Sequence, residues 1–134
     1  MPTAESAAQP QVAPRVELRI PADGAYVSAL RTATAGLAAR LDFTVDDIDD
    51  LRMAVDEACG LLLAQAADGS ELRCVFTLAR DELRIAVTAS SDVPRLPERN
   101  GFAWAVLSAV AGAVETTTGP DQQVTITIIR QRRT

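Results

Sequence analysis

Apolar and polar residues alternate along four stretches of the chain, which is the pattern of half-buried β-strands. The stretches are residues 15–20, 71–80, 81–90 and 124–130. A short polar link, Arg80-Asp81-Glu82, joins the second stretch to the third, so we expect these two strands to form an antiparallel hairpin. The segment ETTT at 115–118 predicts a further short strand.

Three other segments repeat their apolar residues at steps of three and four, which predicts amphipathic helices. The first follows a turn at 21–24 and runs to about Arg40, the second opens at Thr44 and ends at 68–70, and the third covers 102–114. The predicted order is β-α-α-β-β-α-β-β. Strand pairs joined by short turns favour an α+β fold, a two-layer sandwich with one mixed, mostly antiparallel sheet and helices on one face.

A cluster of acids opens the second helix. It consists of Asp46, Asp47, Asp49 and Asp50. Thr44 can cap this helix, and Asp47 three residues later completes a weaker form of the capping box. The helix dipole also favours negative charge in the first turns, so we prefer a structural role for this cluster over a metal site.

Length and composition favour a single domain in a chain of 134 residues. We expect this domain at 15–131, after a flexible N-terminal arm at 1–14. No apolar run reaches the ~20 residues of a bilayer span, and no signal peptide is visible, so we expect a cytoplasmic protein. The formal net charge of −5 argues against direct nucleic-acid binding, and we interpret Arg130, Arg132 and Arg133 as a solvated terminus.

The chain has no histidine, which excludes Ser-His-Asp and Cys-His catalytic groups. The two cysteines, Cys59 and Cys74, cannot form a tetrahedral zinc site by themselves, and we predict no metal ligands. Both lie in apolar segments, so we expect them to be buried and reduced. The sequence leaves open whether their Cα atoms lie within the ~7 Å that a disulfide requires.

An acidic side chain, Glu57, lies on the second helix opposite the expected core face. A turn of 100° per residue from Val55 places Glu57 about 160–200° away, and Leu61 shares its side. Met53, Gly60 and Ala64 lie on that side too. A surface face is usually more polar, so we expect a loop, a ligand or a partner chain to cover it. A solvated helical acid is the alternative interpretation of Glu57.

The motif LRMAVDEAC at 51–59, preceded by LDFTVDDIDD, resembles the anti-sigma-factor serine kinases of the GHKL (histidine-kinase-like ATPase, Bergerat fold) superfamily. The resemblance covers about residues 15–131 and extends to the actinobacterial branch of stress- and sporulation-type anti-sigma factors. It implies a protein that binds a sigma factor and keeps it from RNA polymerase. It also implies binding of Mg-ATP and phosphorylation of a serine on an anti-anti-sigma antagonist.

The resemblance implies three parts of a nucleotide site. The first is an E-x-x-x-N box, whose glutamate acts on or orients the attacking group and whose asparagine holds magnesium. Glu57 matches the glutamate and is the catalytic candidate. Leu61 stands at the asparagine position and offers no oxygen to a hard cation.

The second part is an adenine-binding aspartate in a D-x-G pattern. Its position falls on Ala89, with Ser91 at the glycine, and Asp92 is a substitute if the loop shifts. The third part is a glycine-rich segment entering the third helix, where backbone N–H groups meet phosphates. Gly101 is retained there, whereas Ala103 replaces the second glycine and Trp104 a leucine. We interpret Trp104 as a core or lid-packing residue.

We therefore expect an anti-sigma factor that sequesters an alternative sigma factor, with a degenerate ATP site and weak or lost kinase activity. The alternative is an active serine kinase that binds Mg-ATP through Glu57, Asp92 and Gly101. A third interpretation is a structural or dimerisation module with no sigma partner. The implied partners are a sigma factor, an antagonist and a second copy in a homodimer. Arg31 and Arg40 are contact candidates, or else solvated helical charges.

Overall fold

The computed structural model describes residues 13–132, and its elements follow the predicted order with a short 3-10 helix added. The strands are β1 (Arg15–Pro21), β2 (Glu71–Leu78), β3 (Glu82–Ser90), β4 (Ala113–Gly119) and β5 (Gln123–Gln131). The helices are η1 (Gly24–Tyr26), α2 (Val27–Arg40), α3 (Val45–Leu63) and α4 (Phe102–Val110). Residues 1–12 of the predicted arm lie outside the described residues, and so does Arg133.

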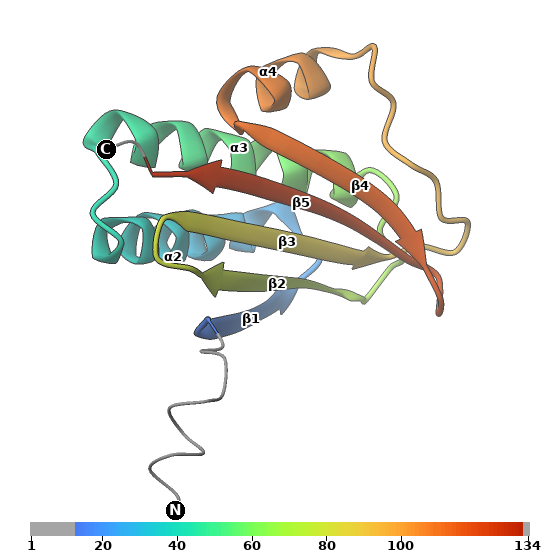
Figure 1. The fold of residues 1–134 in the computed structure, drawn as a ribbon. Coiled ribbons are helices and arrows are strands. Elements are labelled where there is room, and N and C mark those ends of the chain that lie inside the picture. The colour runs from blue at the N-terminus through green and yellow to red at the C-terminus, as the bar shows by residue number, and fades with distance from the viewer. Residues whose placement is uncertain (1–12, 133–134) are drawn as a thin grey trace, which may run out of the picture.

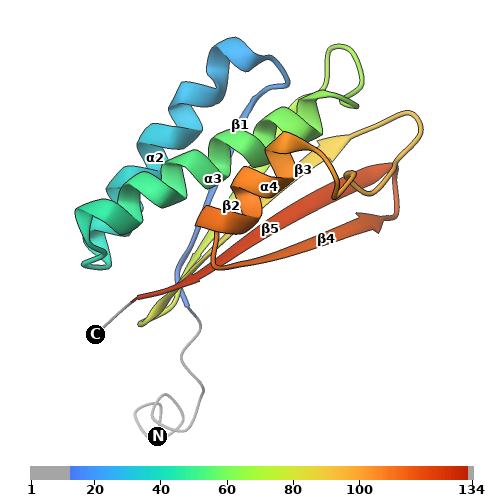
Figure 2. The same ribbon diagram turned by 90° about the horizontal axis from the view of Figure 1, so that it is seen from above.

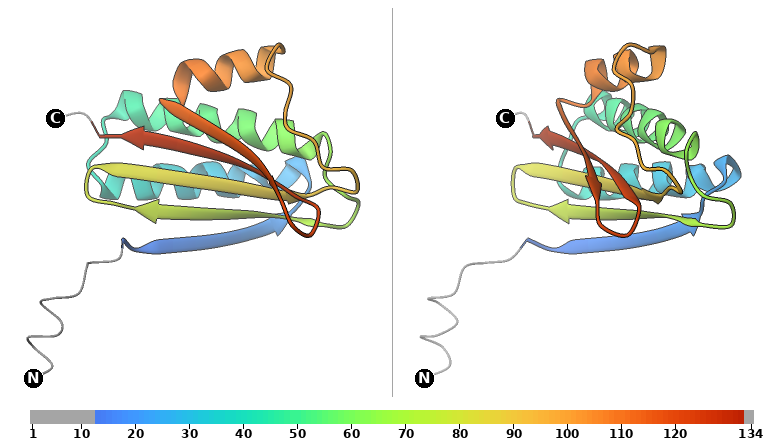
Figure 3. Two further views of the ribbon diagram at one scale, coloured as in Figure 1. Left: turned by 45° about the vertical axis from the view of Figure 1, so that its right-hand side comes forward. Right: turned by 90° about the vertical axis from the view of Figure 1, so that its right-hand side faces the viewer.

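The five strands form one sheet in the order β1-β2-β3-β5-β4, and α2, α3 and α4 all lie on one face of it (Figures 1 and 2). Each neighbouring pair of strands is antiparallel. The sheet twists strongly, as the two side views in Figure 3 show. The predicted α+β two-layer sandwich is confirmed, and the mostly antiparallel sheet is antiparallel at all four of these pairings.

The core lies between the sheet and the helices, where the inward positions of the strands meet the apolar faces of α2 and α3. Its fully buried members include Leu30, Leu51, Val55, Leu62, Leu72, Phe76, Ile85, Val87, Ile126 and Ile128. The alternation that predicts the strands therefore also gives the correct inward face. The predicted hairpin is confirmed, since Thr77 lies opposite Arg84 and Leu78 opposite Leu83.

The third long helix is shorter than predicted, because α4 ends at Val110 and not at 114. Gly112 has φ +86°, a left-handed conformation that glycine adopts without steric cost. A Cβ at this position would lie 2.9 Å from the carbonyl oxygen of Ile129, so the chain also passes close to β5. This turn directs residues 113 and 114 into β4, which is correspondingly longer than the predicted strand at 115–118.

The start of α3 agrees with the predicted cap. The Thr44 hydroxyl oxygen accepts a hydrogen bond from the Asp47 N–H at 3.1 Å, with the Thr44 backbone extended. No helix within residues 13–132 is both long and apolar enough to cross a membrane.

Candidate functional site

The candidate site lies along the outer side of α3, where Glu57 and Leu61 stand one turn apart. Both side chains are half-buried, whereas Met53 and Ala64 on the same side of the helix are exposed. The opposite face of α3 packs on the sheet through residues such as Val55 and the rest of the buried helical stripe. The expected second cover therefore exists around Leu61, while Met53 lies outside it.

The cover over Leu61 is the loop between β3 and α4, residues 91–101, which we call the 91–101 loop. Together with α3 it encloses a groove of about 420 Å³. The helix contributes Leu61, Ala64 and Gln65, and the loop contributes Arg95, Leu96, Pro97 and Glu98. The sequence predicts that a loop, a ligand or a partner chain covers this side of α3, and in the structure a loop does so.

Two hydrogen bonds join the loop to the end of α3. The Gln65 Nε2 atom donates to the Arg95 carbonyl at 2.8 Å, and the Arg95 N–H donates to Gln65 Oε1 at 3.0 Å. We call this pair of bonds the Gln65 clamp. It holds the middle of the 91–101 loop directly beside Leu61.

The beginning of the loop holds the positions that the resemblance assigns to adenine binding. Ala89 is 1% exposed within β3 and lies opposite Val124 of β5. Ser91 is buried, and its N–H donates to the Gln122 carbonyl at 2.9 Å. Asp92 is exposed, and its backbone carbonyl accepts a hydrogen bond from Gln122 Nε2 at 3.2 Å. Asp92 is not among the residues that line the groove.

The end of the loop holds the positions assigned to phosphate binding. Gly101 is the N-cap of α4 with φ −94° and ψ 169°, an extended conformation open to any residue. Ala103 follows as the second residue of α4. Trp104 is half-buried and packs against the core, and the Arg99 guanidinium lies 5.0 Å from its ring centroid. Trp104 thus packs against the core, in agreement with the first of its two predicted roles, core or lid packing.

The helices bring these segments to one end of the molecule. Figures 1 and 2 show α4 running antiparallel to α3, so Gly101 and the second half of α3 lie at the same end. Of the predicted site residues, Leu61 lines the groove and Glu57 lies one turn before it. Ala89 lies in the core below, and Asp92 on the loop outside the groove.

A second, shallower groove of about 380 Å³ lies on the helical layer. It is lined by Arg31 of α2 and by Asp49, Arg52, Met53 and Asp56 of α3. The Arg31 Nη1 and Asp56 Oδ1 atoms are 2.5 Å apart, and both side chains are partly exposed. Arg31 is therefore ion-paired at the surface, while Arg40 is exposed at the end of α2.

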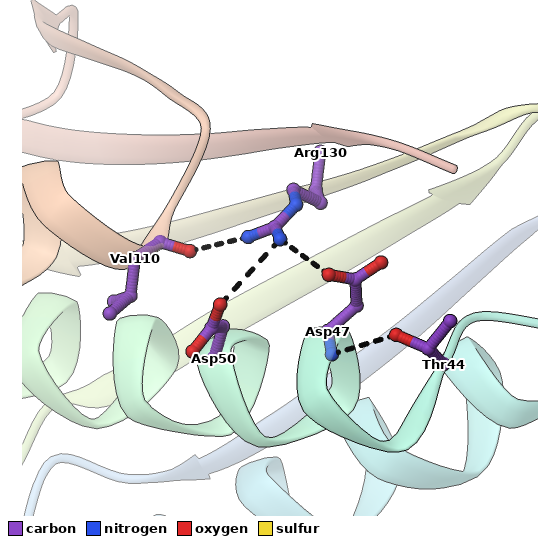
Figure 4. Close-up of polar contacts among 5 residues, drawn as sticks. All are labelled: Thr44, Asp47, Asp50, Val110 and Arg130. Carbon is purple, nitrogen blue, oxygen red and sulfur yellow. Dashed lines mark hydrogen bonds and ion pairs between the residues drawn. The ribbon is translucent and has the colours of Figure 1, made fainter. Parts of the chain in front are cut away.

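Arg130 is wrongly predicted as part of a solvated terminus, because it is 7% exposed. Its Nη2 atom lies 2.6 Å from Asp47 Oδ1 and 3.6 Å from Asp50 Oδ2, and its Nη1 donates to the Val110 carbonyl at 2.7 Å (Figure 4). One guanidinium thus joins β5, the first turn of α3 and the last turn of α4. Arg132 is also paired, with Asp81 at 3.0 Å.

The sequence carried a signal for this buried pair. Arg130 continues the inward phase of β5 set by Ile126 and Ile128, and Asp47 lies four residues before the buried Leu51 on α3. Two charges of opposite sign at inward positions predict a buried ion pair. Asp47 and Asp50 therefore have a structural role as partners of Arg130.

The two cysteines are buried with free thiols, as expected. Burial raises the pKa of the Cys59 thiol to about 12, and the nearby Asp56 carboxylate adds to this effect. Burial also raises the pKa of the Cys74 thiol, with a further contribution from Cys59. Neither thiol forms a reactive thiolate at neutral pH in this environment.

Comparison with known proteins identifies sequence relatives over part of the chain. A serine-protein kinase RsbW of Bacillus cereus (strain Q1) is 40% identical over 75 residues, which is 54% of this chain and 47% of that protein. The serine-protein kinase RsbW of Bacillus mycoides is 39% identical over the same shares. The chain thus spans about half the length of the curated relatives it matches. No protein-family model matches it.

A solved structure shows the same fold over most of the chain. It contains the RsbU and RsbW domains of Rv1364c from Mycobacterium tuberculosis, and superposes with a TM-score of 0.69 at 17% identity. The match covers 90% of this chain and 33% of that one. The expected resemblance to the anti-sigma-factor serine kinases is confirmed by the sequence matches: over about half of its length the chain is similar to the RsbW serine-protein kinases. It also shares the fold of the solved structure that contains an RsbW domain.

Proposed function

We propose that this chain is an anti-sigma factor that binds and sequesters an alternative sigma factor, with weak or lost kinase activity. The observation that carries the second half of the proposal is Leu61. It stands four residues after Glu57, at the position where the resembling family places a magnesium-binding asparagine, and it lies in the groove beneath the 91–101 loop. An alkyl side chain there offers Mg²⁺ no oxygen ligand.

The other two parts of the implied nucleotide site support the same proposal. Ala89 is a core residue with no carboxylate, and the Asp92 side chain belongs to a residue outside the groove lining. Ala103 continues a regular helix, so the second glycine position is not a flexible phosphate-binding turn. The residues present therefore do not fit Mg-ATP in the way that the resemblance implies. We assign no catalytic step to the nucleotide.

The sigma-factor half of the proposal rests on homology and on an available surface. We place the contact on α2 and the neighbouring first strand, where Arg31 borders the groove of mixed charge and Arg40 is exposed. An anti-anti-sigma antagonist would then compete for the chain, and release would follow from partner exchange. We further propose a homodimer, a role in the stress response and a cytoplasmic location.

A second candidate function is an active serine kinase that phosphorylates the antagonist. The names of the relatives, serine-protein kinases at 40% identity, favour it. In this function Glu57 would act on the attacking serine hydroxyl, while Asp92 and Gly101 would bind nucleotide in an altered arrangement. It requires Asp92 to move from the exposed position that it occupies on the loop.

Two experiments separate these functions. Calorimetry with Mg-ATP, repeated with EDTA, measures whether nucleotide binds in a magnesium-dependent way; we expect no such binding, and tight binding would contradict the degenerate site. Incubation with purified antagonist and labelled ATP, using Glu57→Gln as the control, detects phosphoserine. Phosphate transfer that Glu57→Gln abolishes would establish the kinase instead.

The sigma-binding half has its own test. Purified alternative sigma factors of the source organism are titrated against the full chain, with an Arg31→Ala variant and the matched charge variant Arg84→Ala on the far sheet face. We expect one sigma factor to bind and Arg31→Ala to weaken it. If no sigma factor binds, the third interpretation, a structural or dimerisation module, replaces the proposal.

A further inference from the structure

We infer that the Gln65 clamp fixes the 91–101 loop over α3 through protein contacts alone, so that the closed position of the loop does not depend on a bound nucleotide. This inference concerns the regulation of the groove and rests on the proposed function for its biological meaning. Its structural part stands on the hydrogen bonds of Gln65 and Arg95.

The Gln65 side-chain amide pairs with the Arg95 backbone in the way that the backbone of a neighbouring strand would. A glutamine amide carries both a donor and an acceptor, and Gln65 uses both on the same residue, at 2.8 Å and 3.0 Å. Two bonds to one residue fix the orientation of the loop as well as its distance from the helix. The Gln65 backbone is itself anchored, because its N–H donates to the Leu62 carbonyl at 3.1 Å.

The middle of the loop depends on this contact. Within the described chain, residues 93–98 make no backbone–backbone hydrogen bond. The loop is held at its start by the bond from Gln122 to the Asp92 carbonyl, and at its end by the stacking of Arg99 on Trp104. Between these two anchors, the Gln65 side chain forms hydrogen bonds with the N–H and carbonyl groups of the Arg95 backbone.

The clamp also defines the groove, since Gln65 and Arg95 both line it beside Leu61. A loop that phosphates must order would change its position with nucleotide and could transmit that change to a partner. A loop held by Gln65 would instead keep one position with or without nucleotide.

Hydrogen exchange of the full chain tests the clamp. The Arg95 amide, bonded to Gln65, should exchange more slowly than the amides of its neighbours in the loop. Gln65→Ala removes both bonds and should speed exchange at Arg95 by on the order of tenfold. Gln65→Glu keeps an acceptor for the Arg95 N–H but loses the donor to its carbonyl, so an intermediate rate is expected. Gln131→Ala, an exposed glutamine at the end of β5, is the matched control.

Each outcome decides the inference. Equal exchange at Arg95 in wild type, Gln65→Ala and Gln131→Ala would overturn the clamp. Addition of Mg-ATP should leave the exchange of wild-type residues 92–99 unchanged; a tenfold slowing would overturn nucleotide independence together with the degenerate nucleotide site, whereas equal exchange in Gln65→Ala overturns the clamp alone. Failure to bind any sigma factor would instead remove the proposed function while the exchange result stands, so the two failures are distinguishable.

Discussion

Arg130 and Asp47 lie 83 positions apart in the sequence, yet their side chains meet at 2.6 Å with 8% and 4% of their side-chain surfaces exposed. Removing one partner leaves the other charge buried with its main counterion gone, which costs about 3–5 kcal/mol. We therefore expect Arg130→Met and Asp47→Asn each to lower the free energy of unfolding by an amount of this order. Urea denaturation followed by circular dichroism measures it.

The matched control is Arg132→Ala, which breaks the more exposed ion pair with Asp81. Surface pairs contribute about 0–1 kcal/mol, so this variant should unfold near the wild-type midpoint. The double variant Arg130→Met/Asp47→Leu should recover part of the loss, because it leaves no unpaired charge in the interior. Equal midpoints for Arg130→Met and Arg132→Ala would show that the buried pair contributes no more than a surface one.

Replacing glycine by alanine should change the stability of the chain in opposite directions at two positions, Gly112 and Gly36. Gly112→Ala forces a Cβ onto a residue with φ +86° and within 2.9 Å of the Ile129 carbonyl oxygen, and should destabilise the chain by about 1–3 kcal/mol. Gly36→Ala lies within α2 with no atom inside 4 Å of the new Cβ, and should stabilise it by about 0.5–1 kcal/mol. Thermal unfolding of the two variants gives the comparison. Similar melting temperatures would contradict the strain assigned to Gly112.

The fold was largely predictable because the alternation of apolar residues reflects a sheet with one buried face. The same rule places Arg130 inward beside Ile128, but an arginine close to two further arginines more often faces solvent, and this general tendency gives the wrong prediction here. The end of α4 was missed for a different reason. Its apolar run continues through Ala113 and Val114, and only the backbone conformation at Gly112 shows that the helix has already stopped.

The candidate site was predictable one residue at a time, but its arrangement was not. The i, i+4 spacing correctly placed Leu61 on the same side of α3 as Glu57. The Gln65 clamp joins residues 30 positions apart, through a side chain in a turn and a loop with no periodic pattern. Such long-range contacts depend on the path of the loop, which local sequence does not determine.

The two buried thiols predict a loss of stability at alkaline pH. In the unfolded chain a cysteine ionises near its ordinary pKa of 9, whereas the folded pKa of Cys59 is about 12. Folding therefore favours the protonated thiol. The resulting contribution to the free energy of unfolding is fully present below pH 9 and is lost as the pH rises toward 12. Within this window each ionising thiol lowers the free energy of unfolding by about 1.4 kcal/mol per pH unit.

Urea midpoints at pH 7.5 and pH 10 measure this decline, with Cys59→Ala and Cys74→Ala compared against wild type at both values. Each variant should be less stable at pH 7.5, because it leaves a cavity, but should lose less stability between the two pH values. Alkylation by iodoacetamide at pH 8 should be slow in the folded chain and fast in urea. An identical pH dependence in all three proteins would exclude the thiols as its cause.

If Leu61, Ala89 and Ala103 are what keeps Mg-ATP from binding, restoring the family's atoms should create binding. Leu61→Asn supplies an oxygen for magnesium, Ala89→Asp a carboxylate for adenine, and Ala103→Gly a closer backbone approach to phosphate. We expect wild type to show no magnesium-dependent stabilisation and the triple variant to gain it. A gain of about 1.4 kcal/mol corresponds to ATP at roughly ten times its Kd.

A double variant, Leu61→Asn/Ala103→Gly, is measured in parallel. Ala89 is 1% exposed, so an aspartate at this position would bury a carboxylate in the core and destabilise the fold. Thermal shifts with ATP, with and without EDTA, provide the readout. Equal magnesium-dependent shifts in wild type and both variants would show that these three positions do not limit nucleotide binding.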